Sequence, residues 1–114
     1  MRLINQTKSI ILAEEVSFAS TPLKRIKGLL GRKDFHPQEA LIIKPCSSIH
    51  TFFMRFTIDV VFLNKQDCVV KTISSIKPFR LSSIYFKAHY AIELPANTIF
   101  QTQTQINDII TIEY

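Results

Sequence analysis

Glycine is scarce in this chain: its 114 residues include only Gly28 and Gly31. Loops that cradle the phosphates of nucleotides are built from several closely spaced glycines, because only glycine lets the backbone approach a phosphate so closely. Two glycines in one short segment cannot build such a loop. The scarcity therefore excludes the dinucleotide-binding fold and the P-loop as interpretations of this sequence.

Long apolar runs are also missing. The first apolar run is short and ends at Glu14, and no later run approaches the roughly 20 residues that cross a bilayer. The sequence therefore predicts no signal peptide and no membrane span, and we expect a cytoplasmic protein.

Cysteine is limited to Cys46 and Cys68, whose spacing forms neither a CxxC redox motif nor a zinc knuckle. In the cytoplasm both are expected to be free thiols. A chain of this length removes roughly two-thirds of its unfolded surface from water, so it needs no disulfide, metal or cofactor to fold. We expect a single domain over residues 1–114.

Positive charge exceeds negative charge, with a formal net charge of +5. Much of the excess lies in the basic segment 22–33, which contains Lys24, Arg25, Lys27, Arg32 and Lys33. Such a cluster can attract phosphate or an acidic protein partner. The alternative is that it forms only the solvated face of a helix.

A helix is predicted over residues 22–31. Thr21 can accept a hydrogen bond from the first turn, and Pro22 suits the first helical position because its missing N–H is not needed there. Gly31 can adopt the left-handed conformation that ends a helix. Helical spacing is shown by four apolar residues, Leu23, Ile26, Leu29 and Leu30.

The remainder of the chain is rich in β-branched and aromatic residues and predicts strands. One or two strands are expected within 8–18, and 64–67 has the composition of a hairpin turn. A loop with one helical turn is expected at 95–108. The other predicted strands are 40–44, 50–54, 59–63, 68–73, 90–94 and 109–114. This pattern predicts a mostly β (α+β) domain, an antiparallel β-sandwich or small barrel with one short helix.

Chemically interesting side chains gather in the segment "CSSIHTFFMRFTIDVVFLN", residues 46–64. Asp59 begins a predicted buried strand, where an unpaired charge is strongly unfavourable. Arg55, four residues earlier, is the candidate partner. Such a pair could fix the turn between them, or both residues could contact a substrate. Alternation along the strands predicts that Phe52, Val60 and Phe62 are buried.

Cys46 and His50 together permit two further interpretations. A nearby histidine can hold a thiolate, so the pair could act as nucleophile and base. They could also be two ligands of a metal, but neither His36 nor His89 has an evident reason to supply a third. A catalytic thiol would also need an oxyanion hole, and the sequence shows none. We therefore predict no metal site.

Several separated blocks of the sequence resemble one known family. The blocks "GLLGR", "PCSSIHTFFMRFTIDVVFLN", "KPFR" and "AIELPANT" occur in the order found in the uncharacterised bacterial family named domain of unknown function 192. The resemblance covers about residues 21–114. This chain has Thr57 where the family usually has proline, and Asn97 and Asn107 where it usually has glycine. Asparagine tolerates positive φ better than other non-glycine residues, so we expect the turns to be preserved.

The resemblance implies a compact domain similar to a jelly-roll sandwich and implies no established activity. The family's most distinctive polar positions fall on Gly28, Arg32, His50, Met54, Arg55, Asp59 and Glu93.

Three functions follow in order of preference. The first is a binding module with a pocket near His50, Arg55 and Asp59 for a small polar or anionic ligand or a protein segment. The second is an enzyme that uses Cys46 and His50. The third is nucleic-acid binding through the basic segment 22–33, which ranks last because no recognisable motif accompanies it. The candidate ligand-binding residues are Cys46, His50, Met54, Arg55, Asp59, Arg32 and Glu93.

Overall fold

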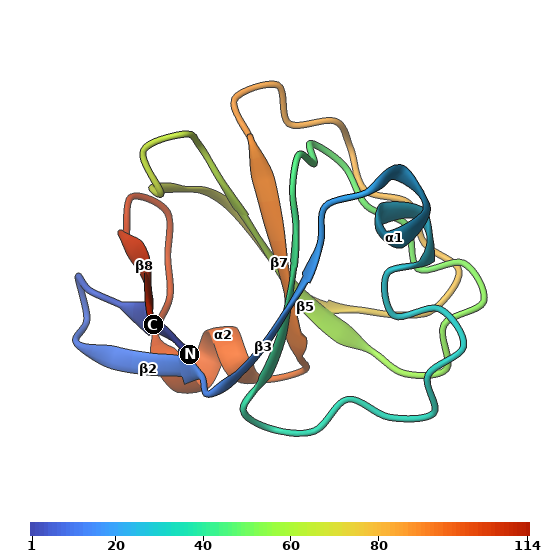
Figure 1. The fold of residues 1–114 in the computed structure, drawn as a ribbon, viewed down its shortest axis with the longest axis horizontal. Helices are drawn as coiled ribbons and strands as arrows, with labels where there is room; N and C mark the ends of the chain where they lie inside the picture. Colours follow the sequence, from blue (N-terminus) through green and yellow to red (C-terminus); the bar gives the residue numbers. More distant parts are fainter.

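The computed structural model describes the backbone of residues 1–114 and all side chains except that of Ile26. The described chain contains eight strands, which form two sheets, and two short helices (Figure 1). The elements in order are β1 (Arg2–Asn5), β2 (Ile10–Ala13), β3 (Glu15–Ala19), α1 (Pro22–Lys27), β4 (Glu39–Ile43), β5 (Ile58–Leu63), β6 (Val69–Ile76), β7 (Tyr90–Pro95), α2 (Thr98–Thr102) and β8 (Ile110–Glu113).

The larger sheet has the strand order β3-β4-β7-β5-β6. Two of its three inner strands, β5 and β7, are buried at every position. A strand covered on both faces has no solvent side, so its sequence becomes a nearly unbroken apolar run such as "VVFL". Neighbouring strands are antiparallel except for β3 and β4, which run parallel.

One face of this sheet packs on the smaller sheet, β2-β1-β8, and on α2. Val61 and Leu63 of β5, with Ile92 and Leu94 of β7, point into this core. Because β1 pairs with β8, the two ends of the chain lie beside each other (Figure 1).

The other face of the larger sheet is covered by irregular chain and by the segment around α1. Val60 and Phe62 of β5 and Ala91 of β7 belong to this second core. The covering loops, 44–57 and 77–89, are joined through Thr51, whose N–H donates to the carbonyl oxygen of Arg80 at 2.9 Å. The N–H of Arg80 in turn donates to Oγ1 of Thr51 at 2.9 Å. These bonds satisfy buried polar groups where no strand ladder exists.

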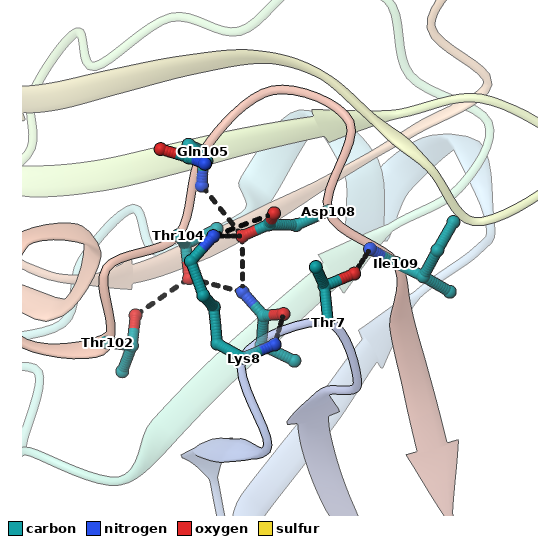
Figure 2. Close-up of polar contacts among 8 residues, drawn as sticks. Thr7, Lys8, Thr102, Thr104, Gln105, Asp108 and Ile109 are labelled. Atoms are coloured by element: carbon teal, nitrogen blue, oxygen red, sulfur yellow. Dashed lines mark hydrogen bonds and ion pairs between the residues drawn. The ribbon is translucent and has the colours of Figure 1, made fainter.

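A polar cluster ties the C-terminal loop to β1 (Figure 2). Asp108 accepts hydrogen bonds from Nδ2 of Asn5 at 2.9 Å, Nζ of Lys8 at 3.0 Å and the N–H of Gln105 at 3.0 Å. Burial acts to raise the pKa of Asp108, but these hydrogen bonds and the charge of Lys8 hold it below its usual value. The cluster therefore favours the ionised carboxylate.

The structure confirms the mostly β fold and the packing of two sheets, and no closed barrel forms in the described chain. The predicted helix is shorter than 22–31, because Gly28 adopts a φ of +47° and its N–H closes the last turn on Lys24. Asn97 and Asn107 have φ values of 79° and 80°, which confirms the turns expected there.

The predicted strand 50–54 is wrong. Phe53 has a φ of 64°, so the chain turns at this point instead of extending. Phe52 is consequently 40% exposed, contrary to the burial that alternation predicts, whereas Val60 and Phe62 are buried as expected. Strand β1 and the parallel pairing of β3 are features that the sequence does not predict. No helix among the described residues is long and apolar enough to cross a membrane.

Candidate functional site

A cavity of about 290 Å³ lies between α1 and the second core of the larger sheet. Three parts of the chain line it: residues 22–30 around α1, residues 43–54 at the end of β4 and the following loop, and Glu93 from β7. Most of its walls are apolar, with polar groups at a few places. This composition is typical of small-molecule sites.

Glu93 forms the most unusual part of the lining. It lies in the middle of the larger sheet, opposite Leu41 of β4 and Val60 of β5, and is 1% exposed. Its Oε1 has no hydrogen-bond partner. Burial raises the pKa of Glu93 to about 8, because the charged form loses its hydration. At neutral pH the carboxyl is therefore mostly protonated and can both donate and accept a hydrogen bond.

Gly28 covers the same carboxyl from the end of α1. A Cβ at this position would lie 3.4 Å from Oε1 of Glu93 and 4.0 Å from Cδ1 of Ile43. The positive φ of Gly28 also favours glycine. Gly28 thus ends α1 and leaves room beside Glu93.

His50 borders the same cavity and is half-buried. Its ring stacks on Phe52 with centroids 5.5 Å apart and an interplanar angle of 22°. Nδ1 of His50 is buried and has no hydrogen-bond partner. Buried polar atoms are almost always satisfied, so two residues with unsatisfied atoms in the lining of one cavity are an unusual combination.

Cys46 also lines the cavity, with a protonated thiol. Its Sγ donates to the carbonyl oxygen of Ser48 at 3.0 Å. Burial raises the pKa of Cys46, and the nearby Glu93 raises it further, whereas Arg25 acts in the opposite direction. A nucleophilic cysteine needs a lowered pKa, so this environment does not activate the thiol.

Met54, Arg25 and Lys27 complete the features of the lining that bear on chemistry. Met54 is buried in the second core and offers the cavity a flexible apolar wall. Arg25 is half-buried and Lys27 is exposed, so both bring positive charge to the side of the cavity formed by α1.

Asp59 and Arg55 do not belong to this cavity, and the predicted pocket shared by His50, Arg55 and Asp59 is wrong. Asp59 is fully buried on the opposite face of the sheet, where Oδ1 accepts from the N–H of Ser75 and Oδ2 from the N–H of Ile99, both at 2.9 Å. Arg55 is exposed, and in the described structure it makes no ion pair with Asp59. Asp59 therefore joins β6 and α2 to β5.

Arg32 lies in the loop before β4 and not in the cavity lining. Its Nη2 donates to Oε1 of Glu39 at 2.8 Å, and its guanidinium lies 5.4 Å from the ring centroid of Phe35. Burial acts to raise the pKa of Glu39, but the hydrogen bonds from Arg32 and from the N–H of His36 lower it overall. Arg32 thus fastens this loop to the start of β4.

The structure therefore brings together Cys46, His50, Met54 and Glu93 and separates Arg32, Arg55 and Asp59 from them. The sequence does not predict that Gly28 adjoins Glu93 or that Arg25 lines the same cavity. The only sign of a link in the sequence is that Gly28 and Glu93 both occupy distinctive positions of the resembled family. In the described part of the chain, no three His, Cys, Asp or Glu side chains gather as metal ligands would.

Residues 3–112 match the family called domain of unknown function 192 (DUF192), described as "Uncharacterized ACR". The chain belongs to the DUF192 family. A similar relative is a UPF0127 protein from Pyrococcus furiosus, 35% identical over 93% of this chain and 93% of its own length. Another is a UPF0127 protein from Thermococcus kodakarensis, 32% identical over 96% of this chain and 71% of its own length.

These DUF192 relatives are archaeal, so the description of the family as bacterial is not confirmed.

The fold is similar to that of a protein of unknown function from Novosphingobium aromaticivorans, whose structure was determined by crystallography. The TM-score is 0.86 at 13% identity, and the match covers 98% of this chain and 84% of that one. At this identity the likeness establishes the fold alone.

Proposed function

We propose that this DUF192 domain binds a small ligand in the cavity between α1 and β7. The observation that carries the proposal is the buried carboxyl of Glu93, which lines the cavity with an Oε1 that has no hydrogen-bond partner. An unsatisfied buried polar group costs about 1–3 kcal/mol. A ligand that supplies the missing hydrogen bond would recover part of this free energy on binding.

The lining favours a ligand with an apolar body and one hydrogen-bonding group. Ile43, Ile49 and Met54 offer apolar contact, while Glu93 and Nδ1 of His50 offer unused polar atoms. A group that donates a hydrogen bond, such as an amide, hydroxyl or ammonium, suits Glu93. A carboxylate beside Glu93 would be disfavoured by repulsion once Glu93 ionises.

An acidic group on the ligand would find its counter-charge at Arg25 and Lys27, on the side of α1. If the ligand is anionic, as the sequence predicts, we propose that its negative group lies beside Arg25 and Lys27 and not against Glu93. We also propose that the domain works in the cytoplasm, where Cys46 and Cys68 would stay reduced. No specific observation favours thiol catalysis or nucleic-acid binding through 22–33 over this proposal.

Titration by NMR with three probes of matched shape, benzamide, benzylamine and benzoate, tests the proposal. We expect benzamide and benzylamine to shift the backbone amides of Gly28, His50 and Glu93, and benzoate, whose carboxylate should lie toward α1, to shift the amides of Arg25 and Lys27 more than that of Glu93. Glu93→Leu should weaken benzamide binding, whereas Glu15→Leu, a change at an exposed glutamate of β3, should not. Absence of shifts with all three probes, or shifts confined to other faces, would contradict the proposal.

A further inference from the structure

The basic residues of the chain are distributed unevenly. Segments 20–33, 44–57 and 77–89 contain ten of its 14 Lys and Arg residues and none of its nine Asp and Glu residues. The ten are Lys24, Arg25, Lys27, Arg32, Lys33, Lys44, Arg55, Lys77, Arg80 and Lys87. We call the surface of these three segments the basic apolar face.

The same segments expose large apolar side chains. Those with much of their surface in water are Leu23, Phe53, Phe79, Leu81, Ile84 and Phe86. Phe53 and Phe79 contact each other edge to face at 5.4 Å, and both have positive φ, at 64° and 61°. Bulky residues rarely adopt this conformation, so the backbone holds these two rings outward at some energetic cost.

The three segments adjoin one another. Loops 44–57 and 77–89 are joined by hydrogen bonds at Thr51 and Arg80, and segment 20–33 shares the cavity lining with 44–57. α1 lies at the side of the molecule away from β2 and β8 (Figure 1). Positive charge and exposed apolar groups are therefore concentrated in one region.

A shallow depression of about 410 Å³ lies within this region, beside the exposed Leu81. Its lining includes Lys77 and Arg80 together with Ser74, Ser75 and Ser83, and also Ser82, whose hydroxyl already donates to the carbonyl oxygen of Ser83 at 2.9 Å. Hydroxyl, ammonium and guanidinium groups are the donors that phosphate oxygens accept. The depression can therefore receive a phosphate-bearing headgroup next to apolar side chains.

We propose that the basic apolar face docks on membranes that contain anionic phospholipids. Exposed Phe and Leu side chains would enter the boundary of the acyl chains, and Lys and Arg would meet the negative headgroups. The three segments contain no acid, and of their ten basic residues Arg32 is paired with Glu39 of β4. Leu23, Leu81 and Ile84 cannot stack on nucleic-acid bases, which favours lipid over single-stranded RNA as the partner. This inference does not depend on the ligand cavity.

Single-tryptophan reporters test the docking directly, because the chain contains no Trp. Phe86 is 90% exposed on the basic apolar face, and Phe100 is 82% exposed on α2, which packs on the other face of the sheet. With vesicles of phosphatidylcholine and phosphatidylglycerol, we expect Phe86→Trp emission to shift to the blue and to be quenched by brominated lipid. Phe100→Trp should show neither change, and pure phosphatidylcholine should have little effect.

Charge reversal in the parent chain provides the second arm. Lys77→Glu with Arg80→Glu should lower the affinity for the anionic vesicles, measured by co-sedimentation, at least about tenfold. Added salt should lower the affinity of the parent in the same way. Lys65→Glu, a charge reversal in the exposed turn after β5, is the control for a change elsewhere on the surface and should bind as the parent does. Equal binding to neutral and anionic vesicles, binding to neither, or tighter binding to single-stranded RNA would each overturn the proposal.

Discussion

Gly28 lies over the carboxyl of Glu93, so that a Cβ at position 28 would come within 3.4 Å of Oε1. The end of α1 and the middle of β7 meet at this point. Glu93 is kept from water there, and its Oε1 receives no hydrogen bond. The pair joins the two features on which the proposed binding depends: a space beside the sheet and an unsatisfied polar group facing it.

Replacement of this glycine tests the importance of the space. Gly28→Ala should lower the free energy of unfolding by about 1–2 kcal/mol because φ is positive, and should also weaken benzamide binding. Gly31→Ala is the matched control, because Gly31 has a φ of +84° and a Cβ added there would meet nothing within 4 Å. It should lose similar stability and bind benzamide normally. Equal binding by both variants would contradict the assigned role of Gly28.

The raised pKa of Glu93 predicts how stability depends on pH. In the unfolded chain the carboxyl ionises near its ordinary value of 4.5, whereas in the folded protein it keeps its proton up to about 8. The folded state binds the extra proton between these values, so stability should fall as pH rises from 4.5 to 8. Glu93→Gln should remove this dependence and become more stable than the parent at pH 8, by up to about 5 kcal/mol. Urea unfolding at several pH values measures the difference, and Glu15→Gln should leave the slope unchanged.

Asp59 is predicted to stabilise the fold through backbone groups and not through Arg55. Asp59→Ala leaves the N–H groups of Ser75 and Ile99 without their acceptor, the second of them buried, and should cost about 2–4 kcal/mol. Arg55→Ala should change stability by less than about 0.5 kcal/mol, because Arg55 is exposed. A double-mutant cycle that shows strong coupling between Arg55 and Asp59 would disprove this assignment.

The polar cluster at Asp108 should govern stability in acid. Its pKa is lowered in the folded state, so its contribution is present above the unfolded value of 3.8 and is lost as pH falls through the folded pKa. Asp108→Asn should therefore destabilise the protein at pH 7 and reduce the loss of stability below pH 3.8. Thermal melting across this range provides the check. A variant as stable as the parent at pH 7 would show that the charge of Asp108 contributes nothing to stability.

Short sequence patterns correctly predict those parts of the fold that depend on residues close together in the sequence. The apolar runs of β5 and β7 and the turns at Asn97 and Asn107 are correctly predicted, because strand burial and positive φ leave direct marks in sequence. The segment 50–54 has strand-like composition, but its backbone bonds go to the neighbouring loop at Arg80. Composition alone does not show which partner the backbone will find.

At the candidate site, contacts between residues far apart in the sequence could not be predicted either. Proximity in sequence favours Arg55 as the partner of Asp59, yet the actual donors, Ser75 and Ile99, lie 16 and 40 positions away. The meeting of Gly28 with Glu93 likewise depends on how α1 packs over β7. Contacts between distant segments are set by the packing of the layers, which a single sequence does not display.

The protonation of Glu93 in the folded domain tests the central claim most directly. Glutamate labelled with ¹³C at the carboxyl carbon would report the titration of Glu93, assigned by comparison with Glu93→Gln. We predict a midpoint near 8 in the free protein and a lower midpoint with benzylamine, whose ammonium group stabilises the carboxylate. A midpoint near 4.5 that benzylamine does not move would contradict the proposed site, because Glu93 would then be an ordinary solvated carboxylate.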